Sequence, residues 1–315
     1  MIKNIPILVK REFWEHKGGF IKAPIIVGIV MLILTILLYI TGRVFVVNSG
    51  SSEHFSSAIN HLNKLTSAEL QFFWDSMFIG SAQMFLTILF FVLFFYVLGS
   101  LFDDRKDGSI QFWKSLPVSD FETVLSKLLT AIVFVPLAFS VIFIFYMFAY
   151  LLLSSVLVLI SGLNPIDIIW QPVHLFKGFF IILFGATVQM LWALPVYGWL
   201  MFCSSWFKTK PFLWSFFIPL IIAIAWYFIN AITQFNLLNI NMFKIPMRYV
   251  AHALVPFGSN SGLNFGYNHN NSTTISDMFT RLSESISDIH LIYGIIFAAI
   301  FIGISIWVRR YRNTT

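Results

Sequence analysis

The sequence predicts an all-α integral membrane protein with six transmembrane helices, preceded by an N-terminal interfacial helix. Two observations predict this class. Of the 315 residues, 58% are hydrophobic and only 11% are charged, whereas a soluble domain carries roughly 25% charged residues. The apolar residues also form six long blocks without Asp, Glu, Lys or Arg, and each block reaches the ~20 residues that a bilayer-spanning helix needs.

The six predicted spans cover residues 23–47, 77–102, 128–160, 178–207, 211–235 and 289–308. The third block stays free of charge as far as Asp167, so its end is expected to project outward or to tilt. The spans are joined by an external loop at 48–76, a cytoplasmic loop at 103–127 and a large external loop at 236–288. Residues 1–315 are therefore expected to form a single transmembrane domain.

Basic residues predict the orientation, because Lys and Arg are retained on the cytoplasmic side of a membrane. With the N-terminus inside, 14 of the 20 lysines and arginines fall in cytoplasmic segments. Both termini are therefore expected in the cytoplasm. The basic residues flank apolar blocks, so the net charge of +6 indicates membrane topology rather than nucleic-acid binding.

Several kinds of chemistry lack their sequence signals. No GxxxxGK[ST] phosphate loop and no HExxH zinc motif occurs, and Cys203 is the single cysteine. We therefore predict no catalytic, cofactor or metal site in this chain. The six predicted span cores also contain no Asp, Glu, Lys, Arg or His. Ion-coupled transporters place such groups in the membrane, so energy for transport is expected to come from another protein.

The first of two notable cytoplasmic segments is residues 1–22. Ile5, Leu8 or Val9, and Phe13 share one helical face with basic residues around it. This pattern predicts a helix in the headgroup layer, with its apolar face in the acyl boundary. The alternative interpretation is a simple topological anchor.

The second segment lies in the 103–127 loop. Charged residues open it, Gly108 permits a turn, and an apolar stretch with aromatic Phe112 and Trp113 follows. Ser119 and Glu122 then form a capping box for a helix that continues into the third span. This aromatic stretch could be the point at which a partner protein acts on the spans. The residues alone favour the other interpretation, in which Phe112 and Trp113 lie in the headgroup region, because interfacial Trp is common.

These features resemble the permease subunit of bacterial ABC exporters of the ABC-2 type. In that family a cytoplasmic interfacial helix precedes six spans, and an enlarged external segment precedes the last span. The resemblance is carried most specifically by the charged run Asp103–Asp107, the turn Gly108-Ser109, the apolar stretch Ile110–Ser115, the step Leu116-Pro117-Val118-Ser119 and the following Lys127-Leu128-Leu129. The opening Val9–Phe13 also fits the start of such chains.

The resemblance implies a permease in the bacterial inner membrane that pairs with a second copy or a related permease. Two separate ATPase subunits would bind ATP and Mg²⁺ and drive export. The residues implied in coupling to the ATPase are Ser109, Ile110, Phe112, Trp113, Lys114, Leu116 and Pro117 of the loop, with Phe13 and Trp14 of the N-terminal helix.

Gln83, Gln189 and Asn230 are polar residues in otherwise apolar spans. Two roles are open for them: lining a substrate path, or hydrogen bonding between helices, which is the commoner role. The function also has alternatives, namely a self-standing secondary transporter or channel, a lipid-directed membrane enzyme, and a non-transporting protein for peptide sensing or immunity. The absence of charge in the predicted span cores favours the ATPase-driven exporter over the secondary transporter.

Overall fold

The computed structural model describes residues 4–41, 44–45, 52–53, 65–108, 118–233, 244–258 and 275–311. These residues are helical apart from turns and one short ladder. In that ladder β1 (Val44–Phe45) pairs antiparallel with β2 (Ser52–Glu53). The all-α prediction is thus confirmed in substance for the part of the chain that the structure describes.

Six helices in these ranges are long and apolar enough to cross a membrane, as the sequence predicted. They are η2–α2 (Gly18–Lys22 and Ala23–Thr41), α4 (Ser67–Lys106), the continuous α6–η3–α7 (Asp120–Leu129, Thr130–Phe134 and Val135–Ile160), α8 (Leu175–Trp206), α9 (Pro211–Thr233) and α12 (Ile289–Tyr311). The chain is therefore a multi-pass membrane protein. The segments η2 and η3 are π-helical turns, each accommodating one extra residue within its helix.

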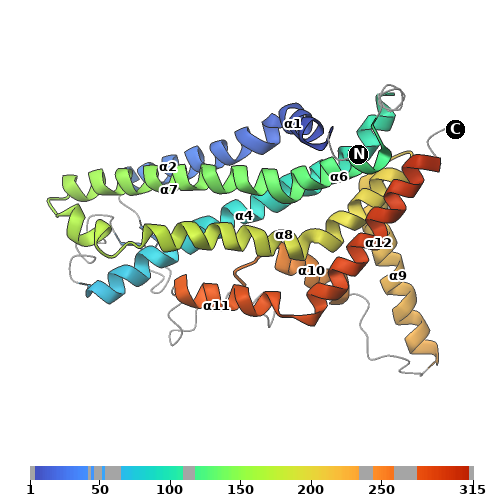
Figure 1. The fold of residues 1–315 in the computed structure, drawn as a ribbon. Helices are drawn as coiled ribbons and strands as arrows, with labels where there is room; N and C mark the ends of the chain where they lie inside the picture. The colour runs from blue at the N-terminus through green and yellow to red at the C-terminus, as the bar shows by residue number, and fades with distance from the viewer. Residues whose placement is uncertain are drawn as a thin grey trace.

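Four shorter elements surround the spans. Helix α1 (Ile5–Glu15) lies across the start of α2, toward the end of the molecule where α6 and the last turn of α12 lie (Figure 1). The π-helical turn η4 (Ile166–Trp170) follows α7, and α10 (Lys244–Leu254) and α11 (Ile275–Ile286) pack against α8. The predicted external loop at 236–288 therefore contains two helices.

Several span boundaries differ from the prediction, most of all at the start of α4. Helix α4 begins at Ser67 rather than near Met77, because Thr66 and Glu69 form a complete capping box. The Thr66 backbone N–H donates to the Glu69 carboxylate at 2.8 Å, and the Glu69 N–H donates to the Thr66 hydroxyl at 3.4 Å. Part of the segment predicted as loop 48–76 is thus helical. The first span is shifted toward the N-terminus, since it begins at Gly18 and α2 ends at Thr41.

The core lies between α4 and α8. In each of these helices, 56% of the residues in the most apolar 18-residue stretch are buried. Their central residues are inaccessible, among them Leu89, Leu93 and Ala193. Helix α12 crosses α8 closely at Gly198, where an added Cβ would come within 3.0 Å of the Ala298 backbone. This glycine therefore sets how closely α8 and α12 approach.

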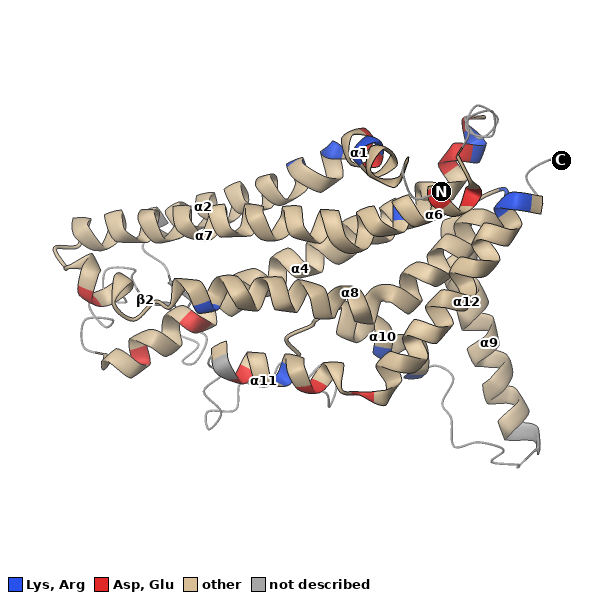
Figure 2. Cartoon of the chain, viewed as in Figure 1, with Lys and Arg blue, Asp and Glu red and all other residues tan. Residues whose placement is uncertain are grey.

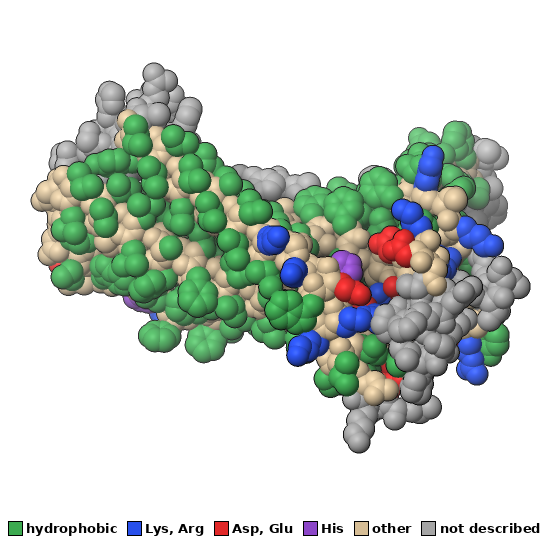
Figure 3. Space-filling model, turned by 90° about the horizontal axis from the view of Figure 1, so that it is seen from above, with side chains coloured by type: hydrophobic (Ala, Val, Ile, Leu, Met, Phe, Trp, Pro, Cys, Tyr) green, Lys and Arg blue, Asp and Glu red, His purple; other side chains and the backbone are tan. Residues whose placement is uncertain are grey.

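The outer surface of the bundle is apolar, as a lipid-facing surface must be. On α7 a continuous exposed stripe recurs every three or four residues, formed by Leu137, Val141, Phe145, Phe148, Leu152, Val156 and Leu159. One face is hydrophobic over most of its length, and charged side chains gather toward one end (Figure 3). The ribbon coloured by charge shows the same end, where α1, α6 and the last turns of α4 and α12 meet (Figure 2).

Helix α9 stands apart from the other spans. Only 6% of the residues in its most apolar 18-residue stretch are buried, and the helix diverges from the bundle after its first turns (Figure 1). Its contacts are made near Pro211: Phe212 and Phe216 pack on Phe94, and the Trp199 indole N–H donates to the Ser215 carbonyl at 3.0 Å. Most side chains of α9 are therefore exposed in the described structure.

Candidate functional site

A network of buried and partly buried charges joins four helices at the end of the bundle where α1 lies. Its members are Glu12 of α1, Asp104 of α4, Asp120 and Lys127 of α6, and Arg309 of α12. We call these five residues the charge network. They come from positions far apart in the sequence, so the fold alone brings them together.

The centre of the charge network is the ion pair between Lys127 and Glu12. The Lys127 Nζ lies 3.0 Å from Glu12 Oε1, and the two side chains are 2% and 0% exposed. The same carboxylate accepts from the Arg11 guanidinium at 2.5 Å and from the Tyr96 hydroxyl at 3.1 Å. Burial without partners would make the Glu12 charge very costly, so these donors explain how the carboxylate can lie in the interior.

The partners of Glu12 determine its protonation state. Burial by itself would raise the pKa of Glu12, because desolvation disfavours the charged form. Lys127 and Arg11 outweigh burial, through charge attraction and hydrogen bonds, and hold the pKa of Glu12 below its ordinary value. The carboxylate is therefore ionised at neutral pH, and the pair with Lys127 is a true ion pair.

Asp104 extends the network from α6 to α12. Its carboxylate lies 3.5 Å from Lys127 Nζ and 3.2 Å from Arg309 Nη1. Arg309 in turn donates through Nε to Asp120 Oδ1 at 3.0 Å. Arg309 is in the last turn of α12 and Asp120 in the first turn of α6, so each charge also complements the dipole of its own helix.

The local sequence explains how these side chains are placed. The Ser119–Glu122 capping box is present, with the Ser119 N–H donating to Glu122 at 3.0 Å and the Glu122 N–H donating to Ser119 at 3.2 Å. This confirms the predicted cap and sets where α6 begins. Lys127 follows Val124 by three residues on the buried face of α6, and that face packs against α1.

A second set of contacts fixes the end of α4 to the end of α8. The Arg105 guanidinium donates to the carbonyl of Ser204 and, at 3.0 Å, to that of Phe207. The Ser204 hydroxyl in turn accepts from the backbone N–H groups of Leu101 and Phe102. One carbonyl in the last turn of α8 and that of its C-cap residue are thus satisfied by α4.

The predicted ATPase-coupling residues are divided by the structure. Ser109, Ile110, Phe112, Trp113, Lys114, Leu116 and Pro117 lie in segment 109–117, outside the described residues. Both flanks of that segment are described. Asp107 and Gly108 end α4, and the Ser119 cap begins α6. Each flank is held by the charge network within one or two helical turns.

Phe13 and Trp14 point in different directions. Phe13 is half-buried and packs on Phe20, with ring centroids 5.8 Å apart. Trp14 is exposed on the outer side of α1. The apolar face predicted to enter the acyl boundary is instead covered by protein at Ile5, Leu8 and Val9, which are buried in the contact between α1 and α6.

Two of the three predicted substrate-path residues hold the end of α10. Gln189 is fully buried and donates at 2.7 Å to the carbonyl of Ala253, and Gln83 donates at 2.8 Å to that of Leu254. Both carbonyls belong to the last turn of α10, where no intrahelical partner exists. Asn230 is half-buried near the far end of α9, the part that diverges from the bundle (Figure 1).

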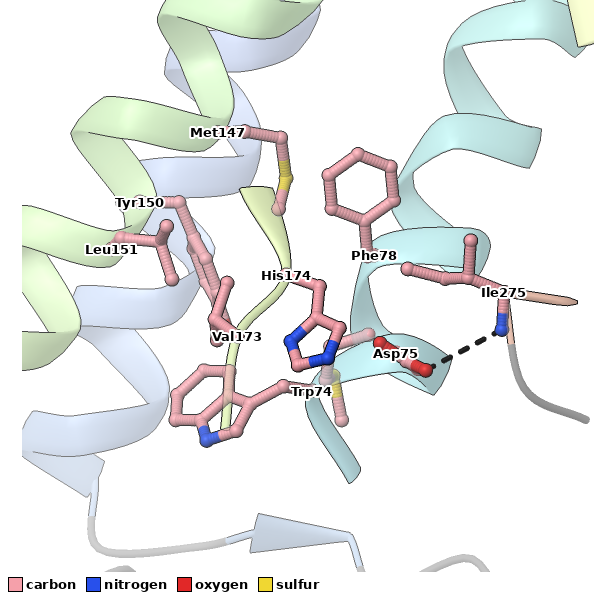
Figure 4. A pocket seen from close by; sticks show the side chains of 10 residues that line it. Trp74, Asp75, Phe78, Met147, Tyr150, Leu151, Val173, His174 and Ile275 are labelled. Carbon is pink, nitrogen blue, oxygen red and sulfur yellow. Dashed lines mark hydrogen bonds between the residues drawn. The ribbon is translucent and has the colours of Figure 1, made fainter. Parts of the chain in front are cut away.

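A second polar site lies at the opposite end of α4, just outside the span predicted from the sequence. Asp75 is only 3% exposed and accepts from the backbone N–H of Ile275, the first residue of α11, at 3.4 Å. It borders a cavity of about 10 Å³, about the size of one water, which is also lined by Trp74, Tyr150 and His174 (Figure 4). The Thr66–Glu69 capping box was the signal that would have placed Asp75 in a helix.

One group of residues has the spacing of a metal site. Potential ligand atoms of Glu12, Glu15 and His16 lie within 4.8 Å of one another. Glu12 is already neutralised by Lys127 and Arg11, so its chemistry is that of ion pairing. We therefore assign Glu12 to the charge network and not to a metal site.

Comparison with known protein families, with curated proteins and with solved structures found no match for this chain.

Proposed function

We propose that this chain is the membrane-spanning permease subunit of an ATP-driven exporter in the bacterial inner membrane. Both of its termini would lie in the cytoplasm. The observation that carries the proposal is the charge network, which ties both flanks of segment 109–117 to α1 and α12. An ATPase partner would bind ATP and Mg²⁺ and act on this segment, and the chain itself would have no catalytic role.

The charge network would couple a movement of segment 109–117 directly to the spans. Asp104 precedes the segment and Asp120 follows it, and both bind Arg309 of α12. Lys127 joins the same point to Glu12 of α1. Because close-packed helices move as units rather than deform, displacement of the segment would shift α4, α6 and α12 together. We propose that this movement opens the substrate path.

A second copy of the chain, or a related permease, would complete the transporter. The exposed apolar faces of α2 and α9 favour such a partner, because α9 has little protein cover within the described structure. Large exposed apolar surface on a span is covered either by lipid or by another helix. Cross-linking between cysteines placed on α9 of two copies would test the pairing, since native Cys203 is buried.

The main experiment is co-purification with the ATPase. A Phe112→Ala/Trp113→Ala variant should insert normally, lose the ATPase from the purified complex and lose transport. Phe121→Ala is the matched control, because Phe121 is an exposed aromatic residue in the first turn of α6. Full ATPase retention and full transport by the double variant would refute the coupling role. A reporter fused after Thr315 should be cytoplasmic, and a periplasmic signal would overturn the topology.

One observation favours a second candidate, a self-standing ion-coupled transporter. Asp75 is a buried carboxylate within a membrane-capable helix, beside His174, and such groups commonly serve ion pathways. Vesicles containing only this polypeptide would test it. Proton flux that an Asp75→Asn variant abolishes would support the second candidate and count against the ATPase-driven one. Asp167→Asn, at the exposed end of η4, is the control.

A further inference from the structure

Helix α1 has two opposite faces with different surroundings. Ile5, Leu8, Val9 and Glu12 are buried against the bundle. At 3.6 residues per turn, Ile7, Lys10 and Trp14 lie on the other side of the helix. Ile7 is 71% and Trp14 58% exposed, and Lys10 is exposed between them. We call Ile7, Lys10 and Trp14 the outer face of α1.

The basic character of this face continues past the end of α1. Lys17 and Lys22 are both exposed; Lys17 precedes the π-helical turn that begins the first membrane-capable helix, and Lys22 is the last residue of that turn. Glu15, the exposed acid nearby, lies 3.7 Å from Arg11. The outer face and the turn after it therefore present three lysines beside two large apolar side chains. Toward this end of the molecule, Lys and Arg side chains lie beside hydrophobic ones, with acidic side chains among them (Figure 3).

The position of this surface identifies its environment. The first span begins at Gly18, so α1 lies at the level where the apolar block enters the bilayer. Trp prefers this interfacial level, where its ring is in the apolar region and its N–H is hydrated. Lysines at the same level extend their amines toward phosphate groups. A face that combines Trp14, Ile7 and three lysines therefore matches a negatively charged lipid surface in both polarity and charge.

We propose that the outer face of α1, together with Lys17 and Lys22, binds the headgroups of anionic phospholipids. The lysines would contact lipid phosphates, and Ile7 and Trp14 would enter the upper acyl region. The partner is thus the membrane itself, and it meets the face opposite to the one that the hydrophobic periodicity singled out. This binding needs no ATPase, so it can be tested separately from the proposed transport.

The first test measures where residue 7 lies. Cys203 is buried and is the only native cysteine, so an Ile7→Cys variant carries one reactive thiol for an environment-sensitive fluorophore. In nanodiscs containing phosphatidylglycerol and no ATPase, the fluorophore should be quenched by lipids with a spin label near the headgroup and protected from aqueous iodide. Lys208→Cys, exposed in the turn after α8, is the water-accessible control. Free quenching by iodide at position 7, with no effect of spin-labelled lipid, would overturn the proposal and leave the face for a cytoplasmic protein.

The second test measures lipid preference. Binding of phosphatidylglycerol and of phosphatidylcholine to the purified chain in neutral detergent is compared by native mass spectrometry. A Lys10→Gln/Lys17→Gln/Lys22→Gln variant should lose roughly tenfold or more of the preference for phosphatidylglycerol. A Lys177→Gln/Lys208→Gln/Lys210→Gln variant removes equal charge from other exposed positions and should keep that preference. An equal preference for phosphatidylglycerol in both variants would refute the proposed lipid site. The thermal midpoint reported by Cys203 labelling shows whether each variant is folded.

Discussion

Replacing Lys127 by Met tests whether the charge network holds α1 to the bundle. At an effective dielectric of about 20, the attraction between unit charges is roughly 5.5 kcal/mol at the 3.0 Å separation from Glu12 and roughly 4.7 kcal/mol at the 3.5 Å separation from Asp104. The variant no longer has to desolvate a lysine, which offsets much of this loss. Removal of one partner of a buried pair costs about 3–5 kcal/mol overall.

Glu12 would keep Arg11 as a partner, so we expect a cost near 3 kcal/mol, at the lower end of that range. The assay uses the single thiol. Cys203 is fully buried, and a thiol-reactive fluorogenic dye therefore reports unfolding during a thermal ramp. The expected decrease in Tm is roughly 6 °C or more.

A double-mutant cycle separates the pair from other effects of the substitution. Glu12→Gln combined with Lys127→Met removes both charges, so the double variant should be more stable than the sum of the two single losses implies. Lys106→Met is the control, because Lys106 is exposed at the end of α4 and its loss should stay within about 0.5 kcal/mol. A Lys127→Met protein that melts with the wild type, or strictly additive losses, would refute the reasoning.

Three further perturbations follow from the contacts. Gln189→Leu should lower the free energy of unfolding by about 1–3 kcal/mol, because the Ala253 carbonyl loses its donor. Hydrogen exchange in α10 should become faster. The control, Thr187→Val on the exposed side of α8, should leave that exchange unchanged. Gly198→Ala should lower Tm, because the new Cβ would lie 3.0 Å from the Ala298 backbone. Gly303→Ala should leave Tm unchanged, because no atom lies within 4 Å of the new Cβ. Equal Tm values for these two variants would contradict the close packing of α8 against α12. Because the pKa of Glu12 is lowered, the ionised side chain should contribute its full stabilisation at neutral pH. This stabilisation should be lost only as pH falls below about 4.5, toward the folded-state pKa. A Tm difference between wild type and Glu12→Gln that narrows above pH 6 would be the contrary result.

Local signals predicted the elements well. The Ser119–Glu122 cap and the uninterrupted helix after it follow from residues three or four positions apart, and such short-range rules need no tertiary information. The same rule applies to Thr66 and Glu69. Treating residues 48–76 as loop overlooked that cap, and with it the helical position of Asp75.

Partners far apart in the sequence could not be predicted in this way. Periodicity correctly placed Ile5 and Leu8 on one face of α1, but it does not distinguish a covering of lipid from a covering of protein. Two charged residues indicate the covering of this face. Glu12 lies on the same face of α1 as Leu8, and Lys127 lies on the buried face of α6. A charge within an apolar face costs free energy unless it meets its opposite, and this argues for protein contact rather than lipid contact.

The polar residues of the spans illustrate the same limit. Gln83 and Gln189 stand out in apolar sequence, and interhelical hydrogen bonding was one of the two roles open to them. Their acceptors, the terminal carbonyls of α10, belong to a helix within the predicted external loop. Only the folded arrangement shows that a short helix ends against the middle of two spans.

The π-helical turn at Thr130–Phe134 has a consequence for how the third span can vary in length. A π-turn is an α-helix with one residue inserted, so the flanking helices keep their faces while the turn bulges. Loss of Ala131 should thus be absorbed as ordinary α-helix, leaving Lys127 and Phe139 facing their present neighbours. Loss of a residue elsewhere in α7 would rotate everything beyond it by about 100°, turning the lipid-facing stripe toward the interior. Natural length changes in this span should therefore concentrate at that turn.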